Sequence, residues 1–563
     1  MPKFFDTPIY DLITSKIDET YSNADKYVEI YDIPREQAEV EISSYTSLKD
    51  AASLGNKEAR EYLINQYSKF LLYFMKKNRI DVDELIDFEN IQNNDIIISF
   101  EFLMNVMDIG DIIKEYNIII RVTEEEIRDI IDKESDLIRE FLSNQANRFK
   151  IMATLVYARE YGQDCVDTIQ HHNINEIGIL DTNYIYVIKG DKIHLKFLQF
   201  KDESVILNIQ KKTTQDSPNN YDQHNPVLVA AKRNSSRITV AGYGCTPTHD
   251  LYYNERIFNL SKITLEEMRD SYNTIDQLIY TFGCLNQKGR GSHFITGSDM
   301  GVGKSTFLLA MLEKVPDEWG IGVLDTQNEL QSRKKYPRKN VITLIETETM
   351  DIKRCFQIML KMARDVLYVG EITKPEEVGE LINASLRLNS GVGGTLHSLS
   401  PYEVVTNLRN LMLRTDMYSD GAIAETDIAR GLDTVFHLAK LPNGRIIVEY
   451  VVEVEYVEQD HYIDNIEEGT LKQRMMNFLK LAQMGLSKYL YTKAYKYNTI
   501  IQYDRDYDIW VPKTMPSEQY FTKIKKYIGE EGIEQFKEYF SEEKNRIDKI
   551  LEVKKQERSR CKE

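Results

Sequence analysis

The sequence predicts an α/β protein built around a parallel sheet, and three observations support this fold class. After residue 263, short apolar segments such as HFITG, GIGVLDT and VLYVGE alternate with helical patterns such as STFLLAMLEKV. These segments are apolar throughout, as in strands that are buried on both faces of a sheet. A glycine-rich loop lies between the first strand and the first helix of this series, which is the position of a phosphate-binding loop.

The pattern divides the 563 residues into four regions. Residues 1–165 are predicted as a helical N-terminal region, because apolar residues recur there at three- and four-residue steps. Residues 166–262 carry short strand-like runs between Gly, Asn and Pro, which predicts a mixed α/β domain. Residues 263–458 are predicted as the parallel-sheet domain, and 459–563 as a mainly helical extension. Hairpins are predicted at Asn443-Gly444 and around Tyr503–Trp510.

Composition excludes some classes of function. The chain has 71 Lys and Arg against 89 Asp and Glu, a net charge of −18, so we expect no stable binding of nucleic acid by bulk charge. No apolar run reaches the ~18 residues of a spanning helix, and the start lacks a basic segment followed by an apolar one, so we expect no transmembrane segment and a cytoplasmic protein. The five cysteines show no C-x-x-C spacing, which indicates neither a zinc site nor a disulfide framework.

The strongest motif is SDMGVGKST, residues 298–306. A phosphate-binding loop needs glycines where backbone N–H groups turn inward, a lysine that reaches the β- and γ-phosphates, and a hydroxyl for Mg²⁺. Gly301, Gly303, Lys304 and Ser305 supply these groups. The alternative is a glycine turn before an ordinary helix, but the order strand, loop and helix favours nucleotide binding.

Three further segments carry carboxylate or imidazole groups. Glu371 ends the apolar run DVLYVGE; it either faces Mg²⁺ and the attacking water, as phosphoryl transfer requires, or is a solvated loop acid. Asp325 and Glu329 follow the strand that comes directly after the phosphate-loop helix; they either orient or deprotonate water, or serve as a helix cap and a first-turn acid. His397 ends the glycine run GVGGTLH; it either contacts a phosphate or a neighbouring subunit, or is a satisfied structural residue.

Taken in order, these segments resemble the secretion and traffic ATPases of type II and type IV secretion systems and of type IV and tight-adherence pili. Between residues 174 and 454, GSDMGVGKST resembles the family's phosphate loop (Walker A), GVLDTQNEL its Asp box, LYVGEITKPE its Walker B segment and GGTLHSLSP its His box. The likeness is to the CpaF-like branch of tight-adherence pilus and conjugative type IV secretion ATPases, which often carry an extra helical N-terminal region. The four-cysteine metal module of another branch is absent from the sequence.

The resemblance implies a RecA-like P-loop NTPase core that binds ATP and Mg²⁺ and hydrolyses ATP. Its nucleotide-binding residues correspond here to Gly301, Val302, Gly303, Lys304, Ser305 and Thr306. Ser305 and Glu371 correspond to the residues that hold Mg²⁺. Glu371, with Asp325 or Glu329, would position water, and His397 would sense the γ-phosphate. The resemblance also places Arg237 and Arg256 where the family directs arginines toward the nucleotide. The alternative is that both are surface arginines on a sheet.

The resemblance further implies a homo-oligomer, a ring of six subunits, at the cytoplasmic face of a membrane-embedded secretion or pilus platform. Four positions depart from the family pattern: Ser298, Leu324, Thr373 and Asn389 stand where a glycine, an acid, an arginine and a histidine are expected. Such departures could slow turnover. Two alternatives therefore remain, a nucleotide-binding scaffold that hydrolyses little and a RecA-like nucleic-acid motor.

Overall fold

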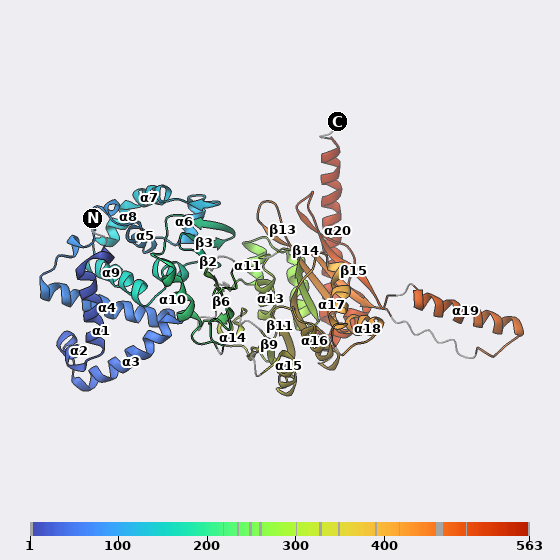
Figure 1. The fold of residues 1–563 in the computed structure, drawn as a ribbon. Helices are drawn as coiled ribbons and strands as arrows, with labels where there is room; N and C mark the ends of the chain where they lie inside the picture. The colour runs from blue at the N-terminus through green and yellow to red at the C-terminus, as the bar shows by residue number, and fades with distance from the viewer. Residues whose placement is uncertain are drawn as a thin grey trace. The chain divides into compact units, whose positions relative to one another are not determined.

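A computed structural model gives the fold of most of the chain. The described residues are 4–217, 219–232, 236–246, 250–257, 262–299, 301–325, 329–346, 350–388, 391–415, 417–457, 466–490 and 493–560. The chain divides into two compact units, 1–259 and 260–563, and each unit is described by itself (Figure 1).

The first unit begins with helices and ends with a sheet (Figure 1). Its helices are α1 (Pro8–Tyr21), α2 (Ala24–Tyr31), α3 (Arg35–Ser53), α4 (Lys57–Asn78), α5 (Ile96–Met104), α6 (Ile109–Glu115), α7 (Glu124–Lys133), α8 (Ser135–Leu142), α9 (Gln145–Glu160) and α10 (Glu203–Thr214). Its strands are β1 (Arg121–Val122), β2 (Glu176–Asp181), β3 (Tyr184–Lys189), β4 (Asp191–Leu195), β5 (Val227–Ala231), β6 (Arg237–Ala241) and β7 (Tyr252–Arg256).

The sheet of the first unit has the order β1-β4-β3-β2-β7-β6-β5. Only β1 and β4 pair in parallel, and every other pair is antiparallel. One continuous core of buried side chains extends from Phe4 in the first helical turn to Ile257 after β7. The N-terminal helices and the sheet of this unit therefore share a single hydrophobic core.

A buried polar network also joins the helical part of this unit to its sheet. The Lys232 ammonium lies 2.6 Å from the Glu255 carboxylate, and both side chains are fully buried. Lys232 also donates to the amide oxygen of Gln170, and the Tyr253 hydroxyl donates to Glu255 over 2.7 Å. Because a buried charge is tolerated only when it is paired and hydrogen-bonded, this network constrains how the helices meet the sheet.

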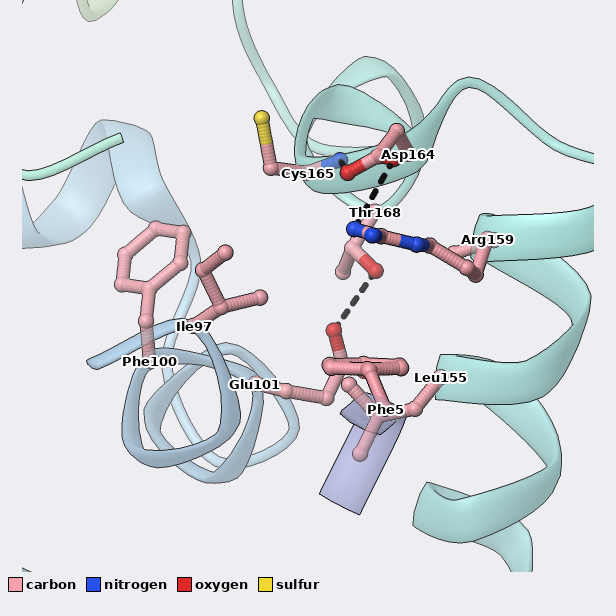
Figure 2. A pocket seen from close by; sticks show the side chains of 10 residues that line it. Phe5, Ile97, Phe100, Glu101, Leu155, Arg159, Asp164, Cys165 and Thr168 are labelled. Atoms are coloured by element: carbon pink, nitrogen blue, oxygen red, sulfur yellow. Dashed lines mark hydrogen bonds and ion pairs between the residues drawn. The ribbon is translucent and has the colours of Figure 1, made fainter. Parts of the chain in front are cut away.

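A small cavity lies between α5, α9 and the turn that follows α9 (Figure 2). Within it the Thr168 hydroxyl donates to the Glu101 carboxylate over 2.7 Å, and Arg159 donates to Asp164 over 3.3 Å. Burial raises the pKa of Glu101 to about 7, against the opposing effects of the Thr168 and Asn105 hydrogen bonds and of a nearby arginine. The cavity therefore holds a carboxyl group that changes its protonation near neutral pH.

The second unit contains the alternating strands and helices. Its helices are α11 (Leu265–Asp270), α12 (Gln277–Lys288), α13 (Lys304–Glu313), α14 (Ser332–Lys335), α15 (Ile352–Lys361), α16 (Pro375–Leu388), α17 (Val404–Met412), α18 (Gly421–Gly431), α19 (Leu471–Leu490) and α20 (Glu518–Arg560). Its strands are β8 (His293–Gly297), β9 (Ile321–Leu324), β10 (Val341–Leu344), β11 (Val366–Val369), β12 (Val392–His397), β13 (Thr434–Lys440), β14 (Ile446–Tyr456), β15 (Tyr495–Asp504) and β16 (Ile509–Pro512).

The sheet of the second unit has the order β10-β9-β11-β12-β8-β13-β14-β15-β16. The strands from β10 to β13 are parallel, and those from β14 to β16 continue the sheet in antiparallel pairs. α11, α12, α13 and α20 pack on one face, and α15 to α18 on the other. Side chains that alternate along β8 serve both cores, with Phe294 in one and Ile295 in the other. The predicted α/β class is confirmed.

Both predicted hairpins form. Gly444 turns between β13 and β14 with a φ of +85°, a left-handed conformation that suits glycine. The second hairpin joins β15 to β16. The long helix α20 contains one non-helical residue, Gly529, with a φ of +78°. In the part of the chain that the structure describes, no helix combines the length and apolarity needed to cross a membrane.

Replacing Glu101 with Gln should remove a pH dependence of stability. Since the fold raises the pKa of Glu101 from 4.5 to about 7, the folded chain keeps a proton that the unfolded chain loses. The resulting stabilisation is full below pH 4.5 and is lost as the pH rises through 7. The free energy of unfolding should therefore fall across this window by about 3 kcal/mol more in the unmodified protein than in Glu101→Gln.

Urea unfolding followed by circular dichroism at several pH values measures this difference. Glu140→Gln, at an exposed position of α8, is the matched control and should behave like the unmodified protein. Parallel pH profiles for Glu101→Gln and the unmodified protein would contradict the raised pKa.

Candidate site at the carboxyl ends of the parallel strands

The predicted phosphate loop connects β8 to α13, as the sequence pattern indicates. Gly301 and Gly303 have φ values of +76° and +79°, a conformation that side chains with a Cβ rarely adopt. Gly297, the last residue of β8, lies under the loop: a Cβ there would be 2.7 Å from Cγ2 of Val302, which is itself buried. Close packing of Val302 over Gly297 therefore supports the loop, although Ser298 replaces the expected glycine one residue later.

Lys304 is the first residue of α13, directly after the loop. Its side chain is largely enclosed, with a relative exposure of 8%, and its Nζ lies 3.1 Å from Nε2 of His397. Ser305 and Thr306 follow in the first turn and are half-buried. The loop, the positive end of the helix dipole and the lysine therefore lie together, as they do in an anion-binding site.

The register of the sheet brings His397 to this loop. β12 pairs in parallel with β8, and His397 is the register partner of Gly297. Both residues end their strands, so His397 lies beside the start of the phosphate loop. The glycines of GVGGTLH have a packing role here, because a Cβ on Gly393 would lie 2.7 Å from the Tyr368 ring.

Glu371 follows β11, the strand on the other side of β12. Its Oε1 lies 3.3 Å from Nε2 of His397. The imidazole therefore stands between the Lys304 ammonium and the Glu371 carboxylate. The His397 and Glu371 side chains keep exposures of 45% and 34%, so this group of three side chains is open to solvent and accessible to a ligand.

Asp325 directly follows β9 and is 2% exposed. Its carboxylate accepts hydrogen bonds from the backbone N–H of Glu329 over 2.9 Å and of Leu330 over 2.8 Å. The carboxylate therefore holds the backbone of Glu329 and Leu330 close to the end of β9. Neither Asp325 nor Glu329 has the helix-terminal position of the alternative interpretation, since α14 begins at Ser332 and its N-cap is Gln331. Glu329 begins the next described segment and is half-buried.

Lys335, which the sequence interpretation did not single out, lies near Asp325. Its Nζ is buried and has no hydrogen-bond partner among the described residues. Burial lowers the pKa of Lys335 to about 8, against the attraction of the Asp325 carboxylate, which raises it. A local signal existed only in the basic run RKK at 333–335, which is more often a solvated surface.

The two predicted arginines lie in the first unit, on adjacent strands of its sheet. Arg237 of β6 and Arg256 of β7 are direct register partners, and both are half-buried. On its other side, Arg256 faces Glu176 of β2.

The departures from the family pattern have local structural settings. Ser298 is exposed at the start of the loop, and Leu324 is fully buried at the end of β9. Thr373 and Lys374 donate their backbone N–H groups to Glu377, whose carboxylate thereby caps α16. Burial raises the pKa of Glu377, and these two hydrogen bonds oppose the rise. Asn389 lies outside the described residues.

The donor groups at this edge of the sheet fit a magnesium nucleotide. Mg²⁺ in such sites takes one or two protein oxygens and completes its shell with phosphate and water, and Ser305 and Glu371 offer a hydroxyl and a carboxylate. The described residues contain no group of three or more His, Cys, Asp or Glu side chains that could hold a metal ion by themselves.

Three solved structures are similar to this chain over about half of its length. The VirB11 ATPase of the Brucella suis type IV secretion system has 14% identity, covers 54% of this chain and 92% of its own, and has a TM-score of 0.28. Legionella pneumophila ATPase DotB has 16% identity, covers 55% and 84%, and has a TM-score of 0.37. The pilus retraction motor PilT with bound ADP has 16% identity, covers 57% and 87%, and has a TM-score of 0.36.

No family model and no curated protein matches the sequence. Likeness at the level of these three structures says nothing of activity, which has to be inferred from the residues of the site.

Replacing Asp325 with Ala should destabilise the second unit. Two backbone N–H groups, of Glu329 and Leu330, would lose their acceptor, and the second of these bonds is buried. The free energy of unfolding should fall by about 2–4 kcal/mol, as measured by urea unfolding. Glu318→Ala, at an exposed position, is the control and should change it by less than about 0.5 kcal/mol. A similarly small change in Asp325→Ala would show that the two hydrogen bonds to Glu329 and Leu330 do not stabilise the fold.

Proposed function

We propose that this protein is an ATP-hydrolysing motor whose site lies at the carboxyl ends of β8, β11 and β12. The observation that carries the proposal is the contact of His397 with both Lys304 and Glu371, at 3.1 Å and 3.3 Å. Three separate strands and one loop deliver these side chains to one point. A lysine at a helix N-terminus and a carboxylate across from it are the two charged groups that phosphoryl transfer needs.

Each residue has a distinct task in this proposal. The backbone N–H groups of 301–306 and the Lys304 ammonium hold the phosphates, and the Ser305 hydroxyl and the Glu371 carboxylate hold Mg²⁺. The metal ion neutralises charge on the transferred phosphoryl group. Glu371 also orients the attacking water. His397, which contacts both charged groups, responds to the γ-phosphate between them.

Asp325 and Glu329 have different roles in this proposal. The Asp325 carboxylate accepts hydrogen bonds from two backbone N–H groups. We therefore propose that it holds residues 329 and 330 close to the end of β9. We propose Glu329, which these bonds hold in place, as the second carboxylate near the attacking water. A hydrogen-bonded carboxylate is a poor proton acceptor, because the bonds stabilise its charged form.

We further propose that Arg237 and Arg256 contribute to the nucleotide site of a ring-shaped homo-oligomer, with six subunits as the expected number. They are direct register partners across β6 and β7, so the two guanidinium groups belong to neighbouring positions of one sheet. The machine is then a type IV secretion or tight-adherence pilus apparatus, with the ring at the cytoplasmic face of its membrane platform. This finer assignment rests on the four sequence motifs and their order.

Phosphate release with Mg²⁺ and ATP tests the site. The variants Lys304→Ala and Glu371→Gln should each lower turnover by at least about 100-fold, because each removes a charged group that acts on the transition state. Lys361→Ala and Glu376→Gln are matched controls: they make the same chemical changes at exposed positions of α15 and α16 and should retain full activity. Specific activity should rise with protein concentration as the ring assembles.

Three results would overturn the proposal. Full turnover in Lys304→Ala would place the hydrolytic site elsewhere. Tight ATP binding by the unmodified protein without phosphate release at any concentration would favour a nucleotide-binding scaffold. Strong stimulation by DNA, with a steep dependence on salt, would favour a nucleic-acid motor instead.

His397→Gln should separate sensing from binding. The amide keeps a hydrogen-bonding group near Lys304 but loses the imidazole that also reaches Glu371. Turnover should fall about 100-fold, while the affinity for ATP, measured by equilibrium titration, should change little. An affinity that falls in step with turnover would show that His397 only holds the bound nucleotide.

A further inference from the structure

The helix α19 presents an apolar stripe that nothing described covers. Leu471, Met475, Phe478, Leu479 and Leu486 have relative exposures of 72%, 59%, 63%, 63% and 63%. Their spacing, together with that of Ala482, places them on one side of the helix. An exposed apolar face of this kind marks a surface that binds something.

The helix begins where its sequence directs, which supports it as a formed element. Thr470 accepts from the backbone N–H of Gln473 over 3.4 Å, and the Gln473 side chain accepts from the Thr470 N–H over 2.9 Å. This reciprocal pair is a capping box. The acids Glu467 and Glu468 lie just before it, at the end of the helix where negative charge is favourable.

The charge of α19 is opposite to that of the chain as a whole. Its sequence LKQRMMNFLKLAQMGLSKYL contains basic residues and no acidic one, whereas the complete chain has a net charge of −18. Lys472, Arg474 and Lys480 are all exposed. By helical spacing, Lys472 borders the apolar stripe on one side and Arg474 on the other, while Lys480 lies on the opposite face.

We propose that α19 docks this protein on an anionic membrane surface, lying in the plane of the headgroups with its apolar stripe in the acyl boundary. A basic helix with Leu and Phe on its apolar face has the composition of such interfacial helices. Cations along both borders of the stripe can extend to the phosphate layer while their stems remain apolar. The net acidity of the chain would repel an anionic membrane, so local attraction has to come from a segment of this kind.

The helix α19 is an insertion in the chain of the second unit. It is inserted between β14 and β15, which are neighbours in the nine-stranded sheet. The proposal concerns residues outside the nucleotide site and does not depend on ATP hydrolysis.

Flotation of the full-length protein with lipid vesicles tests this proposal. The protein should bind vesicles of phosphatidylcholine mixed with phosphatidylglycerol and should not bind vesicles of phosphatidylcholine alone. Lys472→Gln, Arg474→Gln and Lys480→Gln combined should weaken binding about 100-fold at low salt, since each basic residue near the surface contributes about fivefold. Phe478→Ser with Leu479→Ser should weaken it by at least about tenfold.

A matched control variant tests whether the position of the basic residues on α19, and not only the loss of three positive charges, decides vesicle binding. Lys114→Gln, Lys150→Gln and Lys361→Gln combined remove the same charge from exposed positions elsewhere and should leave vesicle binding unchanged. Circular dichroism and phosphate release check that every variant is folded.

Three results would overturn the proposal: no binding to the anionic vesicles, equal binding to both vesicle types, or equal loss of binding in the α19 variant and its control. Self-association that Phe478→Ser with Leu479→Ser abolishes, without vesicle binding, would assign the stripe to a second copy of the chain.

Discussion

The parallel pairing of β12 with both β8 and β11 is the constraint on which the candidate site depends. β8 leads into the phosphate loop, β11 leads to Glu371, and β12 ends at His397 between them. Because parallel strands end at the same edge of a sheet, this order alone brings a lysine, an imidazole and a carboxylate to one point. A shift of β12 by one residue would turn His397 to the other face of the sheet and separate the two charged groups.

The charged side chains fall into two groups, those that solvent can reach and those that are buried. Glu371 and His397 remain partly exposed, where a ligand can reach them. The buried acids instead have structural contacts: Asp325 accepts from the backbone N–H of Leu330, Glu377 caps a helix, and Glu255 in the first unit pairs with a lysine. Among the described residues, Nζ of Lys335 and Oε1 of Glu377 are buried without a hydrogen-bond partner.

Much of the fold could be predicted from the sequence, since the signals were local. The order of strand and helix around residues 298–303, the strand before Glu371 and the turn at Gly444 each depend on a few adjacent residues, and each forms where expected. Long-range relations could not be predicted. Nothing near Tyr495 indicates that β15 returns to the sheet of β14, and nothing near Phe4 indicates that the N-terminal helices share a core with the sheet that ends at β7. For the site, residue types were predictable, but hydrogen-bond partners such as those of Asp325 depend on folded geometry.

The position of α19 in the chain has a consequence for how such a protein changes over time. Tyr456 at the end of β14 and Tyr495 at the start of β15 are register partners, so the chain leaves the sheet and returns to it at one place. Segments of quite different length can connect two points that are already adjacent, with little cost in loop entropy. This junction therefore permits gain, loss or exchange of a targeting segment, or fusion of a reporter domain, while the strands that carry the site keep their register.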